Sequence, residues 1–137
     1  MQEKINHAAL PSSAALAYLG DSVHSLYVRE AVVRTRLSKS KDLHNAANAM
    51  VNAASQAELF RKIEDMLTED ERDVFRRAQN SKHLQKPKHM SIVDYRIATG
   101  FEALIGMLWW IGDRERLYEL LDAAHKNENK NENNNEE

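Results

Sequence analysis

The sequence of 137 residues contains no cysteine, only two prolines and only four glycines. Without cysteine, the chain can form neither a disulfide bond nor a zinc site with thiolate ligands. Its six histidines lack the HExxH spacing and other close ligand spacings, which argues against a histidine zinc site. A metal in this protein would therefore be bound by carboxylates, water and backbone oxygens, the ligand set that suits Mg²⁺, Mn²⁺ or Ca²⁺.

The sequence also lacks a long apolar run. Its most apolar segment, residues 97–112, carries Glu102 near the centre and is too short and too charged to span a bilayer. Residues 1–11 contain no apolar stretch typical of a secretory signal. We therefore expect a cytoplasmic protein that has no membrane partner.

Neither sign of charge dominates the chain, whose net charge is −2. Residues 72–96 nevertheless hold seven Lys and Arg against two Asp, and residues 29–41 hold five against one Glu. The compensating acidic residues lie mainly in residues 58–71 and in the tail after Lys126. The distribution of charge, rather than its total, indicates two positive segments that suit a polyanionic partner.

The scarcity of helix breakers and the abundance of alanine favour an all-α fold, and no segment alternates with a period of two. After Lys126 only Asn, Glu and Lys remain, so we expect one domain over residues 1–125 and a disordered tail over residues 126–137. Apolar spacing and capping signals predict about five main helices, at about residues 12–35, 39–66, 68–78, 91–111 and 113–125.

Asp21 lies in the first expected helix, on the side opposite its apolar stripe. That stripe contains Leu16, Leu19, Val23, Leu26 and Tyr27. The side that carries Asp21 is made mainly of small residues, which allow another helix to approach closely. Gly20 destabilises a helix by about 1 kcal/mol relative to alanine, so its presence needs a reason. This pattern fits a surface aspartate beside a helix contact as well as it fits a functional aspartate.

Glu102 lies in the fourth expected helix, which is apolar almost all round and should therefore be buried. A buried carboxylate is costly unless it is paired, hydrogen-bonded, metal-bound or protonated. A salt bridge to an arginine such as Arg96 would explain Glu102, and so would a metal. Two carboxylates from two packed helices can hold one Mg²⁺, which typically takes one or two protein carboxylates along with water and phosphate.

Motifs around these two residues resemble the catalytic domain of the ribonuclease III family. Residues 15–23 (ALAYLGDSV) are similar to its nine-residue signature, and residues 101–106 (FEALIG) to its second acidic motif. The chain resembles most closely the short bacterial branch, the Mini-ribonucleases III, which lack a separate double-stranded-RNA-binding domain. Further matches to that branch lie at residues 42–44, 55–58, 87–88, 95–96 and 99–102, so the resemblance covers about residues 12–122.

The resemblance implies a helical bundle like the ribonuclease III catalytic domain, and a homodimer whose seam includes the helix of the first motif. It also implies Mg²⁺-dependent hydrolysis of double-stranded RNA, with Mn²⁺ as a substitute, and maturation of the large-subunit (23S) ribosomal RNA precursor. By position, Asp21 and Glu102 are the catalytic metal ligands, and Glu58 has a supporting role. The competing interpretation is a non-catalytic module that keeps this fold for RNA binding or dimerisation, but such a module would be expected to have lost Asp21 or Glu102.

Two departures from the family pattern make the acidic cluster sparse. Longer ribonucleases III carry a glutamate where this chain has Ala17, and an aspartate where it has Thr99. The short branch shares both losses. Within that branch, Ala54 often corresponds to a lysine, and residues 77–80 (RAQN) often read RGRN. These differences concern RNA contacts.

RNA contacts are expected from the positive segment that precedes the helix of Glu102, because duplex RNA is recognised mainly through its shape, phosphates and 2′-hydroxyls. The alternative is an ordinary solvated charged loop. The predicted RNA-binding residues are Arg76, Arg77, Asn80, Lys82, His83, Lys86 and Lys88. A second candidate patch consists of Arg29, Arg34, Arg36, Lys39 and Lys41. We interpret Trp109 and Trp110 as packing residues, since a duplex exposes no base faces for stacking.

Overall fold

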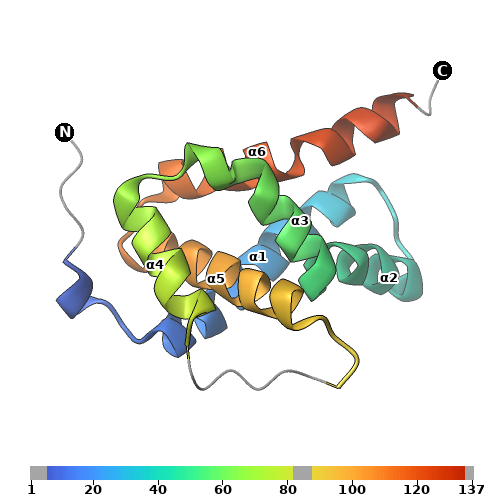
Figure 1. Ribbon diagram of the computed structural model, residues 1–137. Helices are drawn as coiled ribbons and strands as arrows, with labels where there is room; N and C mark the ends of the chain where they lie inside the picture. The colour runs from blue at the N-terminus through green and yellow to red at the C-terminus, as the bar shows by residue number, and fades with distance from the viewer. Residues whose placement is uncertain (1–5, 82–87, 135–137) are drawn as a thin grey trace.

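The structure, a computed structural model, describes residues 6–81 and 88–134, with side chains up to residue 126. Within these ranges the chain forms six α-helices and two short 3₁₀ helices, and no strand (Figure 1). The predicted all-α fold is therefore confirmed. The elements are η1 (His7–Ala9), α1 (Ser13–Arg34), α2 (Ser40–Val51), α3 (Ala53–Ile63), η2 (Glu64–Met66), α4 (Glu69–Gln79), α5 (Ile92–Trp110) and α6 (Arg114–Asn134).

The helix starts follow the capping signals in the sequence. The Ser12 hydroxyl accepts a hydrogen bond from the Ala15 amide and caps α1, and Ser91 caps α5 in the same way. Thr68 and Glu71 form the predicted capping box of α4, in which each side chain accepts from the other residue's backbone amide. These caps satisfy amide groups that a helix leaves without intrahelical partners.

Two predicted helix boundaries differ from the structure. The helix expected over residues 39–66 is divided at Asn52, whose extended backbone (ψ 162°) ends α2 and whose side chain caps α3 by accepting from the Ser55 amide. The last helix, expected to end near His125, continues to Asn134. No Gly or Pro follows His125 to end it. The division of the chain into a domain and a disordered tail stays a prediction.

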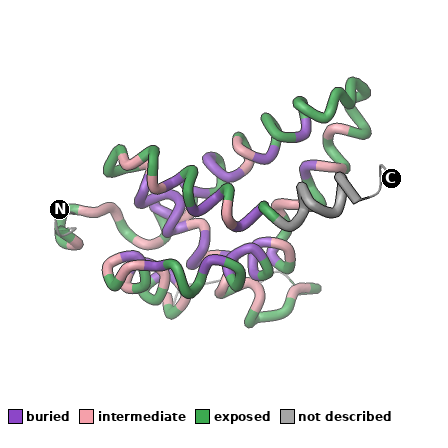
Figure 2. The backbone as a smooth tube through the Cα atoms, turned by 90° about the horizontal axis from the view of Figure 1, so that it is seen from above, coloured by how far each residue is buried: buried purple, intermediate pink, exposed green. Residues whose placement is uncertain are grey.

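Helix α5 forms the centre of the fold, with α1, α3, α4 and α6 packed around it (Figure 1). Nearly every residue from Ala98 to Leu108 is buried, as the prediction of an all-round apolar helix requires. The rings of Phe60 and Phe75 stack 3.9 Å apart and join α3 to α4. Buried backbone is concentrated where these helices meet (Figure 2). Among the described residues, no helix is long and apolar enough to cross a membrane.

The orientation of α1 differs from the prediction. Its buried residues are Leu16, Gly20, Val23, His24, Val28 and Val32. Leu26, predicted to point inward, is 59% exposed. The reason is that apolar residues occur around the whole helix, and α5 packs on the side where Gly20 permits close approach. The sequence pattern therefore predicted the helix correctly but not all of its inward residues.

Two polar networks hold α6 against the rest of the bundle. Arg116 donates hydrogen bonds to both carboxylate oxygens of Glu71, at 2.8 and 2.9 Å. Burial alone would raise the pKa of the Glu71 carboxyl, but these bonds and those from Thr68 lower it below its ordinary value. Near the other end of this contact, the ring nitrogens Nε2 of His24 and His125 lie 3.1 Å apart. The Gln56 amide lies 3.2 Å from His24 Nδ1, which brings α3 into the same network.

Candidate active site

Gly20 and Gly106 face each other where α1 crosses α5. A Cβ atom added to Gly20 would overlap the backbone oxygen of Glu102 and lie 2.8 Å from the nitrogen of Gly106. A Cβ atom added to Gly106 would in turn overlap the backbone oxygen of Leu16. The two helices are thus in backbone contact, which only glycine allows at these positions. We call this contact the glycine seam.

The glycine seam brings Asp21 and Glu102 together, because each is a near neighbour of a seam contact. Asp21 follows Gly20 and is exposed, whereas Glu102 is partly buried. Burial, and secondarily the negative charge of Asp21, raises the pKa of the Glu102 carboxyl to about 8. Two neighbouring carboxyl groups, one exposed and one partly buried, can bind one cation between them. The cation would then replace the proton on Glu102.

The Glu102 carboxyl is not neutralised by an arginine. Among the described residues, no ion pair or hydrogen bond joins it to Arg96 or to another basic side chain. Arg96 is itself exposed. Since no fully buried side-chain oxygen in the described part lacks a hydrogen-bond partner, the Glu102 oxygens reach solvent. They are consequently open to a ligand.

Glu58 is exposed on α3, which packs against α5. It does not join Asp21 and Glu102 in a compact group of ligands. Within the described residues, the three ligating side chains whose atoms all lie within 4.8 Å are His7, Asp70 and Asp73, at η1 and α4. That group was not predicted from the sequence.

Thr99 and Ala17, the two positions at which the sequence departs from the expected family pattern, form contacts within the fold. The Thr99 hydroxyl donates a hydrogen bond of 2.9 Å to the Tyr95 carbonyl one turn earlier in α5. Ala17 is partly buried on α1, and it packs against the core. Neither position therefore adds an acidic side chain beside Asp21 and Glu102.

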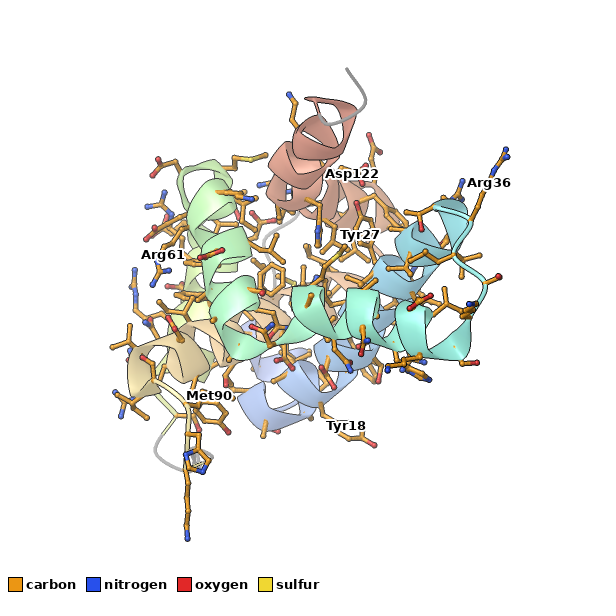
Figure 3. The ribbon with its side chains drawn as sticks, turned by 90° about the vertical axis from the view of Figure 1, so that its right-hand side faces the viewer. Tyr18, Tyr27, Arg36, Arg61, Met90 and Asp122 are labelled. Carbon is orange, nitrogen blue, oxygen red and sulfur yellow. The ribbon has the colours of Figure 1, made fainter. Side chains whose placement is uncertain are left out.

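The predicted RNA-binding residues lie at the C-terminal end of α4 and just before α5. Arg76, Arg77, Asn80 and Lys88 are exposed. Arg76 lies 3.8 Å from Asp73 in an ion pair whose arginine is 65% exposed, so its charge remains available to solvent. Lys82, His83 and Lys86 lie outside the described residues. Figure 3 places Met90, which precedes α5, at the lower edge of the molecule.

The exposed face of α1 carries three large apolar side chains at helical spacing. Tyr18 is 84%, Leu26 59% and Val33 62% exposed. Figure 3 shows Tyr18 projecting away from the bundle. Trp110 is also exposed, while Trp109 is partly buried with the Arg114 guanidinium 3.4 Å from its ring centroid. Trp109 therefore packs against the core at the end of α5, whereas Trp110 lies on the surface.

The buried histidine His24, which lies next to the glycine seam on α1, was not predicted from the sequence. His24 is fully buried one turn after Gly20, and its ring meets Phe101, the neighbour of Glu102, edge to face with centroids 5.2 Å apart. The signal that could have found it is the spacing of four residues between Leu16, Gly20, His24 and Val28, which marks the true buried stripe.

A family model for the ribonuclease III domain matches residues 14–113 of this chain. That span includes α1, the glycine seam and both seam carboxylates. The chain therefore belongs to the ribonuclease III family, the endoribonucleases that act on double-stranded RNA.

Within this family, the chain is similar to Mini-ribonucleases 3. It is 41% identical to that of Thermoanaerobacter sp. over 113 residues, which are 82% of this chain and 80% of the relative. It is 42% identical to that of Symbiobacterium thermophilum, covering 80% and 84% of the two chains. A crystal structure of a protein from Fusobacterium nucleatum matches with a TM-score of 0.79 and 27% identity, over 90% of this chain and 99% of that one. The predicted resemblance to the short branch is confirmed.

Proposed function

We propose that this endoribonuclease hydrolyses duplex RNA with Mg²⁺ held by Asp21 and Glu102, and that Mn²⁺ can replace Mg²⁺. The observation that carries the proposal is the pair of carboxylates at the glycine seam, one exposed and one partly buried with a raised pKa. Oxygen ligands in this number fit Mg²⁺, which completes its shell with water and substrate phosphate.

The two carboxylates have different tasks in this proposal. The raised pKa of Glu102 favours its protonated form at neutral pH, and the carboxyl would have to lose that proton to hold a cation, so cation binding would be stronger as pH rises. Asp21, being exposed, faces the incoming phosphate. When bound, the ion lowers the pKa of a coordinated water and offsets charge on the scissile phosphate. Hydrolysis would form a bond from a water oxygen to phosphorus and break the bond from phosphorus to the ribose oxygen, with the water losing one proton and the ribose oxygen gaining one.

Glu58 supports the site without a direct place in it. Its exposed position on α3, a helix packed against α5, suits a residue that holds metal-bound water or orients the substrate. Arg76, Arg77, Asn80 and Lys88 hold the RNA backbone in this proposal, since all four are exposed on the approach to α5.

The functional unit is a homodimer whose seam includes the exposed face of α1. Apolar side chains as exposed as Tyr18, Leu26 and Val33 are typical of a surface that another protein covers. A second copy would supply a second acidic pair, so that there would be one for each RNA strand. The resemblance to Mini-ribonuclease III supports the 23S ribosomal RNA precursor, in the cytoplasm, as the substrate.

The decisive experiment incubates the purified protein with a structured duplex RNA, with and without Mg²⁺. We expect cleavage only with the metal, and a loss of at least about a hundredfold in Asp21→Asn, because the metal loses a charged ligand. The matched control is Asp65→Asn, which changes an exposed aspartate in η2 and should cut like the wild type. Absence of metal-dependent cleavage in the wild type would refute the proposed mechanism; equal cleavage by Asp21→Asn would refute the site.

A further inference from the structure

The connection between α1 and α2, with the first turn of α2, is rich in exposed basic residues. Arg36, Lys39 and Lys41 are all exposed, and in the described part of the chain none of them forms an ion pair. We call these three residues the α1–α2 patch. Arg34 is left out because its guanidinium donates a 2.6 Å hydrogen bond to Glu30, and Arg29 because it lies on the α1 face of Leu26 and Val33, which the proposed dimer covers. The three charges therefore contribute little to the fold and are available to a partner.

Arg36 adopts a backbone conformation that favours a different residue. Its φ is +70°, which no other non-glycine residue in the described ranges shares. It stands two residues after the end of α1, where helices commonly place a glycine or asparagine in this left-handed conformation. A side chain with a Cβ atom is strained there. An arginine in this position therefore weakens the fold relative to glycine.

Lys39 likewise breaks the capping pattern of this chain. The N-caps of α1, α3, α4 and α5 are Ser, Asn, Thr and Ser, and each accepts a backbone hydrogen bond through its side chain. Lys39 caps α2 without such a bond. Its positive charge, and that of Lys41 in the first turn, also oppose the partial positive charge of a helix N-terminus. Two positions at this helix start thus carry basic residues against the local preference, although Asp42 in the same turn follows it.

Residues that break local rules without a gain for the fold are concentrated at functional sites. Here the property gained is positive charge, which binds phosphate groups. The patch lies along the helix that carries Asp21: thirteen residues separate Asp21 from the end of α1, about 20 Å at 1.5 Å per residue. Figure 3 shows Arg36 projecting into solvent, on the opposite side of the view from Met90.

We propose that the α1–α2 patch binds the sugar–phosphate backbone of the duplex about 20 Å, measured along α1, from the phosphate that is cleaved. The position of the cleaved phosphate rests on the proposed function, whereas the binding of the duplex backbone to the α1–α2 patch does not. A duplex held at the acidic pair reaches the patch only if it extends well beyond the cut. The patch consequently favours long duplexes over short ones.

The test compares the wild type with the double variant Arg36→Gly/Lys39→Ser. This variant removes two positive charges and introduces the residues that the backbone favours there, glycine after a helix end and serine at an N-cap. Binding is measured without divalent metal at several salt concentrations, on a duplex of about 16 base pairs, which spans two successive minor grooves. We expect weaker binding and a salt slope reduced by about 2, roughly one per lost phosphate contact. The melting temperature of the double variant should equal or exceed that of the wild type, so that poor folding cannot explain the weaker RNA binding.

Two controls separate this proposal from the proposed function. Lys62→Ala/Arg72→Ala removes two exposed charges from α3 and α4 and should leave the salt slope closer to that of the wild type. In cleavage assays with Mg²⁺, Arg36→Gly/Lys39→Ser should raise KM on the long duplex and leave a duplex of about half that length unaffected. An unchanged salt slope on the long duplex, or an equal reduction in the control, would overturn the proposal, even if cleavage is normal.

Discussion

The two faces of α1 carry apolar residues of similar size, yet only one of them packs inside the protein. The buried face meets α5 through Leu16, Gly20 and His24, and the closest contact is between backbones. The other face presents Tyr18, Leu26 and Val33 to solvent. Hydrophobicity alone therefore does not decide which side of α1 faces the core. The glycine does, because it allows a distance that leucine forbids.

The glycine seam should be the most sensitive contact of the molecule. In Gly106→Ala the new methyl group overlaps the Leu16 backbone oxygen, so α1 and α5 must separate. We expect the free energy of unfolding to fall by about 3 kcal/mol, the upper end for overpacked cores, and cleavage to be lost. Urea unfolding measures the first and a duplex assay the second.

Gly100→Ala is the matched comparison on the same helix. Its methyl group meets mainly the Phe75 ring, a side chain that can move more easily than a backbone. The loss of stability should therefore be smaller than in Gly106→Ala. If the two variants prove equally stable, the seam is not a rigid backbone contact.

The exposed face of α1 should respond to charge by changing the oligomeric state rather than the fold. Leu26→Glu places a carboxylate in the proposed dimer seam, where its desolvation is unfavourable. We expect sedimentation equilibrium to show a dimer for the wild type and a monomer for Leu26→Glu, with helical content unchanged. Val93→Glu, which alters a residue 57% exposed on α5, should remain dimeric. A monomeric wild type would contradict the assignment of this face.

The partly buried carboxyl of Glu102 should make the stability of the protein depend on pH. This effect should be smaller than those of the substitutions above. The Glu102 pKa of about 8 lies above its ordinary value of 4.5, so between these pH values the folded protein binds more protons than the unfolded chain. Stability in metal-free buffer should therefore fall as pH rises from about 4.5 to 8, by less than 1.4 kcal/mol per pH unit because the carboxyl is partly exposed.

Glu102→Gln is the variant that checks this titration. It should be more stable than the wild type at pH 8 without metal, and its stability should depend less on pH. Mg²⁺ should raise the melting temperature of the wild type more at pH 8 than at pH 6, because the cation replaces the proton. A wild type whose pH dependence matches that of Glu102→Gln would show that Glu102 does not titrate in this range.

Much of the fold followed from local rules that a sequence displays directly. The caps at Ser12, Thr68 and Ser91 predicted three helix starts, and each cap is formed. The division at Asn52 was missed because apolar residues continue across it and no Pro or Gly marks it. The side chain that stops one helix there also starts the next, and such a dual role has no distinct sequence signal.

The candidate site likewise has features that the sequence predicted and features that it did not. Small residues around Asp21 predicted a close helix contact, and the apolar surroundings of Glu102 predicted a carboxyl with restricted access to water. Motif resemblance then paired the two residues. The network of His24, Gln56 and His125 could not be predicted, because its members are far apart in the sequence. Polar groups that meet only in the folded protein leave no periodic pattern.

The glycine seam also sets the distance between the backbones of Asp21 and Glu102. Because main-chain atoms of α1 and α5 are in contact, the separation of the Asp21 and Glu102 backbones is set by peptide geometry and not by the size of a side chain. Core residues elsewhere can then be exchanged during evolution or engineering without recalibrating the site. Gly20 and Gly106 are therefore the two positions where adding one carbon atom would change the spacing of the carboxylates directly.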